Sequence, residues 1–409
     1  MKLNLTLSAL ELDAMFADAV LPLPFDRDLA EWSACGVETL TMRRGESRHE
    51  VLFVRSLKHQ FAIKQTTPPL AQKELRNYQK LLALGIKTLQ PVGIVVRTDE
   101  PIEIATPAGV MYEKNDTAFL ITRLEEAVLP ESILFSFGFQ RKAKLEIFDA
   151  IADLFAKCHA RGVYWGDASL ENVLIKFQRE EHTLGKQRRL VAVLSDAETT
   201  EIHPTLSERA KEADIEFFFE SMLWLDEEFR RRGLPRDRAI TDADIEYIYD
   251  RYVWLCDIWN AHRALDAATG IDSEKLFGRF RNARHAQLLQ KHLEEHKWYL
   301  SENARREVPM SDAVEDWYVK YFLPLQDTFS KDEIARLFPD KTELELYIEM
   351  MAHKYFLSEK QKKDVGLSYA MNDYCARFGV ETSAASALLK LFQDLITLSG
   401  QYLALGRRE

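Results

Sequence analysis

The sequence has few of the features that mark secreted, membrane-spanning or zinc-binding proteins. Its four cysteines form no Cys-x-x-Cys pair and lie far apart, at Cys35, Cys158, Cys256 and Cys375, which argues against a zinc site or a disulfide framework. No apolar run approaches the ~20 residues of a membrane-spanning helix, and acidic residues interrupt 1–19, where a signal peptide would lie. The net charge of −11 disfavours general nucleic-acid binding. We therefore expect a cytoplasmic protein without a transmembrane segment.

The stretch that organises the chain lies at 162–175, where a loop separates a helix-like run from an apolar β-type run. Asp167 and Asn172 stand five positions apart in it. Protein kinases and their relatives use this spacing in the catalytic loop, where the Asp orients the attacking hydroxyl and the Asn holds Mg²⁺. The spacing alone occurs by chance in many proteins. The order of helix, Gly-aromatic-x-Asp loop, Asn and strand is much rarer and favours a kinase-like loop.

A second metal-ligating position follows the apolar run 190–194. Asp196 is placed where kinases carry the Mg²⁺-binding Asp of Asp-Phe-Gly. A turn Asp after a core strand is the plain alternative, but the upstream Asp167 and Asn172 favour the metal ligand. Oxygen ligands from Asn172 and Asp196 suit Mg²⁺. Further on, a predicted helix contains Asp214, which would either brace the backbone of the catalytic loop or face solvent as a first-turn Asp.

Lys64 ends an apolar β-type run at 61–64, in the position of the kinase Lys that pairs with the α- and β-phosphates. A Lys at the end of a strand is usually only solvated. A predicted helix over 70–84 follows, however, and carries Glu74. A Lys–Glu ion pair would hold the ammonium toward the nucleotide, so we predict that Lys64 and Glu74 belong to a nucleotide site.

Two further segments are candidates for nucleotide contacts. The connector 43–49 stands where kinases carry a glycine-rich phosphate loop, but it has one glycine, and by itself it is more typical of an ordinary charged hairpin. Over the phosphates, its backbone N–H groups, Ser47 and Arg48 would meet phosphate oxygens. Arg123 and Leu124 follow the β-type run 119–122 and would form the hinge, where adenine binds through backbone hydrogen bonds.

The order of the predicted elements gives the fold class. We expect an α+β, two-lobed protein-kinase-like fold, with an antiparallel sheet in the N-lobe and a helical C-lobe, followed by an all-helical C-terminal domain. The predicted boundaries are a lead-in of helical or irregular structure at 1–33, an N-lobe at 34–126, a C-lobe core at 127–228 and the helical domain at 229–409.

The helical domain contains an internal repeat. The segment 296–302 (His-Lys-Trp-Tyr-Leu-Ser-Glu) matches 353–359 (His-Lys-Tyr-Phe-Leu-Ser-Glu), and further matches follow at the same offset. We predict a duplicated helix-turn-helix unit near 276–321 and 337–378. Five of the seven tryptophans lie beyond 210, and we expect them between packed helices. A groove for a partner between the two copies is the alternative.

The candidate site residues follow the order that they have in kinases: Lys64, Glu74, Asp167, Asn172 and Asp196. This order resembles the protein-kinase-like superfamily. The Tyr-Trp-Gly-Asp loop and the Asp-Ala-Glu-Thr sequence are most similar to an uncharacterised bacterial family. Its front half is grouped with the lipopolysaccharide (Kdo/heptose) kinases, and its back half is a domain of unknown function. The resemblance covers most of 36–375 and implies a kinase-like fold, a site for ATP and Mg²⁺, and an unknown acceptor.

Two departures from protein kinases stand inside the motifs. Trp165-Gly166 replaces His-Arg before the loop Asp, so the Arg that pairs with an activation-loop phosphate is absent. Ala197-Glu198 replaces Phe-Gly after Asp196, so the usual Phe flip is unavailable.

The combined features predict an ATP- and Mg²⁺-dependent phosphotransferase acting on a hydroxyl of a small molecule, sugar or glycolipid. Asp167 would orient the hydroxyl, Asn172 and Asp196 would hold Mg²⁺, and Lys64 would neutralise phosphate charge. Two alternatives stay open: a nucleotide-binding pseudokinase-type regulatory or interaction module, and a kinase-fold nucleotidyltransferase that moves AMP. A protein partner for the C-terminal helices is a further expectation, and the sequence identifies neither the acceptor nor the oligomeric state.

Overall fold

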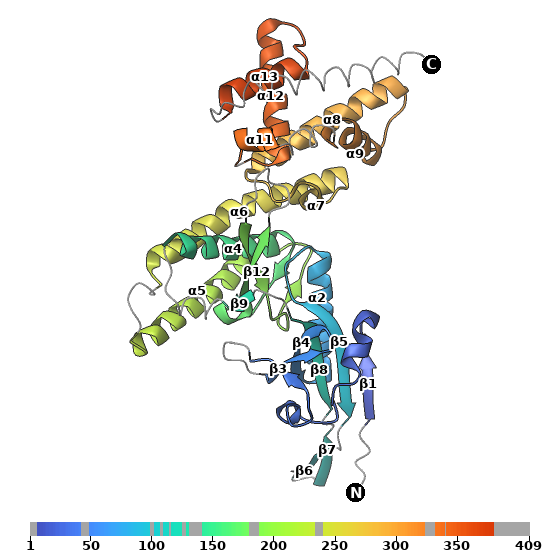
Figure 1. Ribbon diagram of the computed structural model, residues 1–409, viewed down its shortest axis with the longest axis vertical. Coiled ribbons are helices and arrows are strands. Elements are labelled where there is room, and N and C mark those ends of the chain that lie inside the picture. The colour runs from blue at the N-terminus through green and yellow to red at the C-terminus, as the bar shows by residue number, and fades with distance from the viewer. Residues whose placement is uncertain are drawn as a thin grey trace. The chain divides into compact units, whose positions relative to one another are not determined.

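The structure is a computed structural model, and its residues form two compact units (Figure 1). The first unit comprises Met1–Gln178 and Leu190–Cys256, and the second comprises Arg179–Arg189 and Asp257–Glu409. The described residues are 6–41, 49–98, 102–106, 109–113, 116–124, 128–130, 141–179, 188–233, 240–323, 332–339 and 341–379. Ser47 and Arg48, two predicted phosphate contacts, lie outside them. Among the described helices, none is long and apolar enough to cross a bilayer.

The first unit begins with a six-stranded antiparallel sheet. In spatial order its strands are β1 (Thr6–Leu10), β5 (Gln90–Thr98), β8 (Thr117–Arg123), β4 (His59–Thr66), β3 (Val51–Ser56) and β2 (Glu38–Thr39). Alternation along β4 buries Phe61 and Ile63 against Phe119 and Ile121 of β8 in one hydrophobic core. A separate hairpin of β6 (Ile102–Thr106) and β7 (Gly109–Glu113) lies between β5 and β8 in the chain.

The N-terminal segment differs from the lead-in that we expected at 1–33. Thr6–Leu10 pairs with β5 as an edge strand, which the sequence analysis did not anticipate. The short helices η1 (Ala14–Phe16), α1 (Ala17–Val20) and η2 (Leu29–Glu31) follow. Phe16 and Trp32 pack into the core of the sheet. A single five-residue strand carries little periodic signal, and its pairing partner lies far along the chain, so local sequence did not reveal it.

A helix crosses the sheet after β4. The helix α2 (Pro68–Ala83) starts with two prolines in its first turn, where a missing N–H costs no hydrogen bond. Leu75, Tyr78 and Leu81 form its buried face. Gly85 follows with a φ of +72°, a left-handed conformation that glycine adopts without strain and that ends the helix. The helix lies where we predicted one, over 70–84.

The rest of the first unit is mainly helical. It contains α4 (Arg141–Ala160), α5 (Glu208–Arg231) and α6 (Asp242–Thr269), whose last residues belong to the second unit. The rings of Phe155 in α4 and Phe218 in α5 meet edge to face with centroids 5.1 Å apart. The small strands are β9 (Val128–Pro130), β10 (Val163–Tyr164), β11 (Val173–Arg179), β12 (Arg188–Leu194) and β13 (Glu201–Ile202). They form a sheet in the order β12-β11-β9 and a β10–β13 pair.

The sheet with α2 and the helical part built on α4 and α5 give the two-lobed, protein-kinase-like α+β fold that we expected. The single-turn helix η3 (Leu170–Asn172) joins the loop at 162–169 to β11. The segment that follows β12 lies next to this loop, since Ser195 donates its backbone N–H to the carbonyl oxygen of Asn172 (3.0 Å).

Among the described residues of the second unit from 257 onward, every regular element is a helix. Its elements are α7 (Ser273–Phe277), α8 (Ala283–Ala304), α9 (Met310–Trp317), the π-helical η5 (Tyr318–Phe322), α11 (Asp332–Leu337), α12 (Glu343–Gln361) and α13 (Leu367–Phe378). Two helical hairpins recur in it, α8 with α9 and α12 with α13. This all-helical C-terminal part agrees with the expected fold class.

The two hairpins make the same contacts 57 positions apart, from 296 to 353. His296 Nε2 lies 2.9 Å from Asp316 Oδ2, and His353 Nε2 lies 2.7 Å from Asp373 Oδ2. Each His–Asp contact joins the first helix of a hairpin to the residues that follow the turn. The repeated sequence therefore corresponds to a repeated way of closing a hairpin.

The turns of the two hairpins are also alike. Ser301 Oγ accepts the backbone N–H of Val308 (3.0 Å), and Ser358 Oγ accepts that of Val365 (3.3 Å). In both, the first helix ends at a residue in the left-handed conformation, with φ of +51° at Arg305 and +55° at Lys362. We read the pair as one duplicated structural unit.

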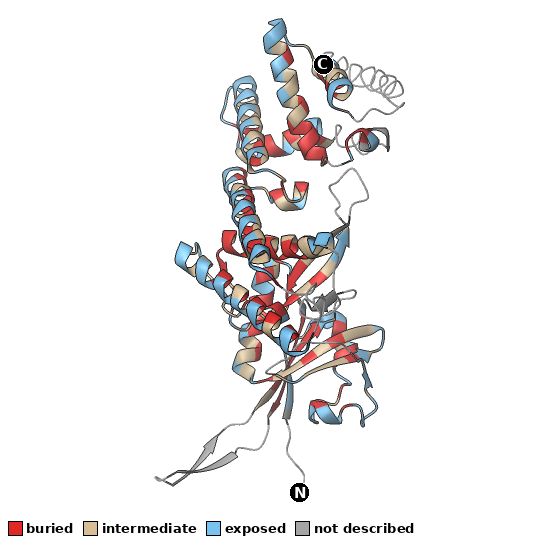
Figure 2. Ribbon diagram, turned by 90° about the vertical axis from the view of Figure 1, so that its left-hand side faces the viewer, coloured by how far each residue is buried: buried red, intermediate tan, exposed pale blue. Residues whose placement is uncertain are grey.

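Many helices carry both buried and exposed residues (Figure 2). The burial of the tryptophans on them differs from our expectation. Trp259 and Trp317 are buried, at 1% and 3% exposure, as expected. Trp224 and Trp298 are 73% and 66% exposed, and Trp254 is 39% exposed, so these three are not core residues. Helical periodicity assigns a residue to a face of its helix, but only tertiary packing decides whether that face is covered.

Candidate functional site

The candidate site begins with an ion pair between β4 and α2. Because Phe61 and Ile63 point into the core, Lys64 projects from the opposite face of the sheet. Lys64 Nζ lies 2.8 Å from Glu74 Oε2, and the Lys64 and Glu74 side chains are 12% and 1% exposed. The two residues that we expected to pair are therefore in contact, in a place largely shielded from water.

Glu74 is held on both carboxylate oxygens. Tyr78, one turn later in α2, places its hydroxyl 2.7 Å from Glu74 Oε1 and 2.6 Å from the carbonyl oxygen of Ser195. Burial, and next the nearby Asp196 carboxylate, raises the pKa of Glu74 to about 7, while Lys64 acts in the opposite direction. A carboxylate this buried is stabilised only by its partners. The Lys64 ammonium therefore stabilises the charge of Glu74, and Glu74 in turn stabilises that of Lys64.

Lys64 also contacts two carboxylates of the segment that follows β12. Its Nζ lies 3.1 Å from Asp196 Oδ2 and 3.2 Å from Glu198 Oε2. With Glu74 these groups place three carboxylates within 4.8 Å of one another. Burial alone would lower the pKa of Lys64, but the charges of Glu74 and Asp196 outweigh burial and hold it above its ordinary value. Lys64 is therefore a permanent cation.

The position of Asp196 is fixed by several hydrogen bonds. Its Oδ1 accepts the backbone N–H of Glu198 (3.0 Å). Its carbonyl oxygen accepts the indole N–H of Trp165 (3.1 Å), which belongs to the predicted catalytic loop. The Ser195–Asn172 backbone bond gives a second connection to that loop. The segment carrying Asp196 and the loop carrying Asn172 are thus one connected structure.

The predicted catalytic loop is braced from α5. Asp214 is buried, and its carboxylate accepts the backbone N–H groups of Trp165 (2.7 Å) and Gly166 (2.8 Å). His159 Nε2 lies 3.2 Å from the same carboxylate. Of the two interpretations that the sequence left open for Asp214, the loop brace is the one present. The backbone before Asp167 is therefore held rigidly.

Asp167 and Asn172 lie on either side of the loop's final turn. The side-chain amide Nδ2 of Asn172 donates to the carbonyl oxygen of Asp167 (2.9 Å), which closes the loop over η3. Both residues are half-buried. The hydrogen bonds of Asn172 and Ser195 and the ion pairs of Lys64 thus connect the five residues that we selected by kinase spacing.

The predicted hinge residues occupy the end of β8. Arg123 pairs with Phe61 of β4 and Gln90 of β5, and its side chain is exposed. The backbone N–H of Leu124 donates to the carbonyl oxygen of Gln60 (2.9 Å). A contact of Leu124 with adenine would therefore use its carbonyl oxygen rather than its N–H.

Several residues of the site were not predicted from the sequence. The most informative is Glu198, which we noted only as a departure from Phe-Gly and which contacts Lys64. His49 Nε2 lies 3.2 Å from Glu198 Oε2. Asn77 donates its side-chain amide to the carbonyl oxygen of Ala197 (2.7 Å). Asn77 and Tyr78 follow Glu74 by three and four positions, and this helical spacing was the available signal that they share its face.

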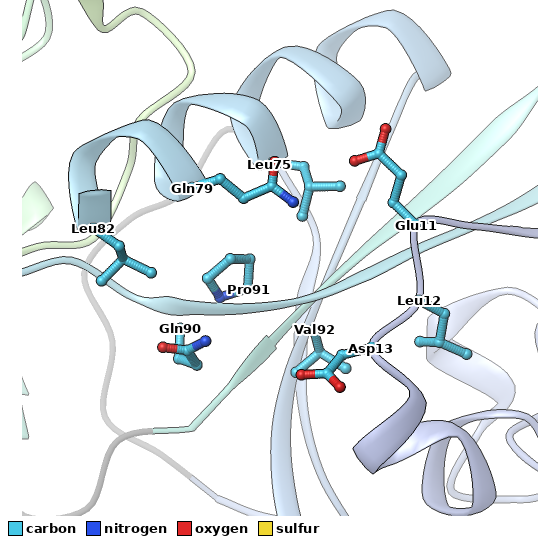
Figure 3. Close-up of a pocket in the computed structure, with 9 residues that line it drawn as sticks. All are labelled: Glu11, Leu12, Asp13, Leu75, Gln79, Leu82, Gln90, Pro91 and Val92. Atoms are coloured by element: carbon cyan, nitrogen blue, oxygen red, sulfur yellow. The ribbon is translucent and has the colours of Figure 1, made fainter. Parts of the chain in front are cut away.

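A pocket lies apart from these residues, between α2, β5 and the N-terminal segment (Figure 3). Its lining combines the apolar side chains of Leu12, Leu75, Leu82, Pro91 and Val92 with the polar side chains of Glu11, Asp13, Gln79 and Gln90. None of the predicted site residues lines it. The candidate site is therefore defined by the network around Lys64 and not by this pocket.

Comparison with protein families gives one match, in the second unit. A family described as a domain of unknown function, DUF4032, matches residues 328–378, which include α12 and α13. The expectation of such a domain in the back part of the chain is thereby confirmed. No curated protein matches the chain.

The solved structures that are similar to the chain include the following three. WaaP in complex with acyl carrier protein is 17% identical, with a TM-score of 0.37, covering 66% of this chain and 99% of WaaP. The Rio2 kinase-ADP/Mg²⁺-phosphoaspartate complex from Chaetomium thermophilum is 14% identical, with a TM-score of 0.29, covering 64% of this chain and 74% of that one. Aminoglycoside-3'-phosphotransferase of type VIII is 14% identical, with a TM-score of 0.28, covering 59% and 100%.

At these levels of similarity no activity transfers from those proteins to this one. The kinase-like fold of this chain rests on its own strand order, on the Lys64–Glu74 pair between β4 and α2, and on the loop that Asp214 braces.

Proposed function

We propose that the protein is an ATP- and Mg²⁺-dependent phosphotransferase that acts on a hydroxyl group of a small molecule, sugar or glycolipid. The observation that carries the proposal is the chain of contacts from Glu74 through Lys64 to Asp196, and from there to the loop of Asp167 and Asn172. An ion pair and two oxygen ligands beside a hydroxyl-orienting Asp are the parts that kinases need.

The ligand atoms fit Mg²⁺, which takes oxygen ligands and the phosphates of a nucleotide. The Asp196 side chain is 33% exposed, whereas Glu74 is 1% exposed, so Asp196 is the carboxylate that a hydrated ion can reach. Asn172 turns its amide nitrogen to the Asp167 carbonyl oxygen, so its amide oxygen is the remaining ligand atom. A bound Mg²⁺ would neutralise phosphate charge.

The remaining roles belong to the protein's own side chains. Lys64, kept charged and directed by Glu74, would neutralise charge on the α- and β-phosphates. Asp167, on a loop fixed by Asp214, would orient the acceptor hydroxyl and accept its proton. Phosphoryl transfer asks the protein mainly for positioning and electrostatic stabilisation, and a rigid loop supplies both.

One observation favours the alternative of a nucleotide-binding module without transfer. Glu198 places a further carboxylate on Lys64, where a phosphate would bind. Labelled ATP separates the proposals. Transfer of label from γ-labelled ATP alone supports the kinase, and transfer from α-labelled ATP supports a nucleotidyltransferase. Saturable ATP binding without transfer to any cell-extract fraction would leave the binding module.

The acceptor class is tested by fractionating the same extract after labelling. We expect label in small solutes or lipids, because the stretch between Asp196 and Asp214 is short for a peptide-docking platform. Label confined to many proteins would contradict a small-molecule or glycolipid acceptor while leaving the kinase itself intact.

A further inference from the structure

We propose that Glu198 occupies the phosphate-binding position of Lys64 in the nucleotide-free protein and competes with ATP for it. The inference rests on the proposed function, in which Lys64 receives nucleotide phosphates. It assigns to Glu198 a role in setting nucleotide affinity.

The bonding capacity of the Lys64 ammonium group limits how many anions it can bind at once. A Lys side chain has three N–H donors and no acceptor. Lys64 Nζ has three carboxylate oxygens within hydrogen-bond distance, at 2.8 Å from Glu74, 3.1 Å from Asp196 and 3.2 Å from Glu198. A phosphate oxygen can be added only if one carboxylate withdraws.

The three carboxylates differ in how firmly they are held beside Lys64. Glu74 is buried in α2 and held by Tyr78, so its departure would leave a buried charge without its cation. Asp196 is fixed by the N–H of Glu198 at its Oδ1. The Glu198 side chain is 24% exposed and contacts Lys64 at the longest of the three distances. Asp196 is 33% exposed but stays in place as the proposed Mg²⁺ ligand, so Glu198 is the carboxylate that turns away, giving up its contacts with Lys64 and His49.

The exchange of the Glu198 carboxylate for a phosphate oxygen on Lys64 affects the affinity for ATP. In the Asp-Phe-Gly sequence of kinases the residue two positions after the metal-binding Asp has no side chain. Here that position carries an anion, and His49, which lies just before β3, places its Nε2 3.2 Å from this carboxylate. ATP must therefore displace Glu198, a group of the same charge as its phosphates. This displacement weakens the binding of ATP, although the residues that bind ATP stay the same.

Three variants of the full-length protein test this, with ATP titrated calorimetrically in excess Mg²⁺. Glu198→Gln keeps the shape and removes the charge, and we expect a dissociation constant about 3- to 10-fold lower than that of the unaltered protein. Glu74→Gln should act in the opposite direction, because it removes the group that directs Lys64. Glu201→Gln is the matched control, an exposed carboxylate three positions away outside the cluster, and should leave the affinity unchanged.

The outcomes distinguish this inference from the proposed function. Unchanged or weaker ATP binding by Glu198→Gln, with Glu74→Gln weaker as expected, would overturn the competition and leave the nucleotide site in place. Absence of ATP binding by the unaltered protein and every variant would overturn both. Circular dichroism checks the fold. If Glu198→Gln does not fold, Glu198→Asp, whose shorter side chain withdraws the carboxylate from Lys64, replaces it with the same expected direction.

Discussion

Lys64 owes its proposed role to the three carboxylates that contact its ammonium group. The ammonium alone would be an ordinary strand-end Lys. Its partners come from α2 and from a segment 132 and 134 positions further along the chain. Removal of Lys64 would leave three clustered carboxylates without a cation, whereas removal of one carboxylate would lessen their mutual repulsion. Substitutions here are therefore expected to act on function more than their exposure suggests.

Replacement of Asp167 should separate phosphoryl transfer from ATP binding. Replacement by Asn should abolish transfer and leave ATP affinity nearly unchanged, because the proposed role of Asp167 is toward the acceptor and not toward the phosphates. Loss of an orienting or general-base carboxylate typically lowers the rate ~10²–10⁴-fold. Turnover of labelled ATP and calorimetric ATP binding measure the two properties separately. Wild-type turnover in Asp167→Asn would remove Asp167 from the mechanism.

The duplicated hairpins of the second unit carry large aromatic residues at equivalent positions that are exposed. Trp298 in α8 and Tyr355 in α12 are equivalent, and both are mostly exposed. Trp317 at the end of α9 is 3% exposed and donates its indole N–H to the hydroxyl of Tyr347 (2.9 Å). Helices thus carry aromatic residues on both covered and uncovered faces.

Truncation of these two tryptophans should therefore have unequal effects on stability. Trp317→Ala should lower the free energy of unfolding by ~3–5 kcal/mol, as core truncations of large side chains do. Trp298→Ala should change it by roughly 0.5 kcal/mol or less, as is usual for surface positions. Urea denaturation followed by circular dichroism measures both. Equal losses in the two variants would show that Trp298 is covered in solution.

The two His–Asp contacts give the hairpins a shared response to acid. The carboxylates and their donors are Asp316 with Lys320 and His296, and Asp373 with His353 and Arg377. Burial alone would raise the pKa of each carboxylate, but the hydrogen bonds outweigh burial and lower the pKa below its ordinary value. A lowered carboxylate pKa stabilises the folded state above the ordinary value near 3.8 and loses that contribution as the pH falls through the lowered value.

We therefore expect both hairpins to lose stability together below about pH 4. Melting followed by circular dichroism between pH 6 and pH 3 checks this. The double variant Asp316→Asn with Asp373→Asn should be less stable at neutral pH and should show a shallower decline in acid. A decline as steep as in the unaltered protein would place the acid-sensitive groups elsewhere.

The whole molecule is divided into two units, and the residues of the candidate site all belong to the first. A ligand stabilises the part of a protein that binds it, by an amount set by its concentration and dissociation constant. ATP with Mg²⁺ should therefore raise the melting temperature of the first unit only. We expect two transitions in differential scanning calorimetry, of which one moves on addition of ATP and Mg²⁺. A single transition that moves as a whole would show that the units unfold cooperatively.

The sequence by itself determined the order of the functional parts. Lys64, Asp167, Asn172 and Asp196 could be named because phosphate and Mg²⁺ chemistry requires particular residue types at the ends of particular elements. The helix α2 and its Glu74 were predictable from proline at its start, glycine at its end and helical spacing. The repeat was also readable, since duplicated residues at a fixed offset need no structure to be seen.

Only the tertiary structure decided which groups meet and which faces are covered. Glu198 reaches Lys64, and Asp214 reaches the backbone of Trp165 and Gly166, through contacts that no local pattern encodes. The exposure of Trp298 depends on whether another element packs against its helix face. Local periodicity follows from the geometry of one element, whereas burial and charge pairing depend on distant segments, and those are brought together only by the fold.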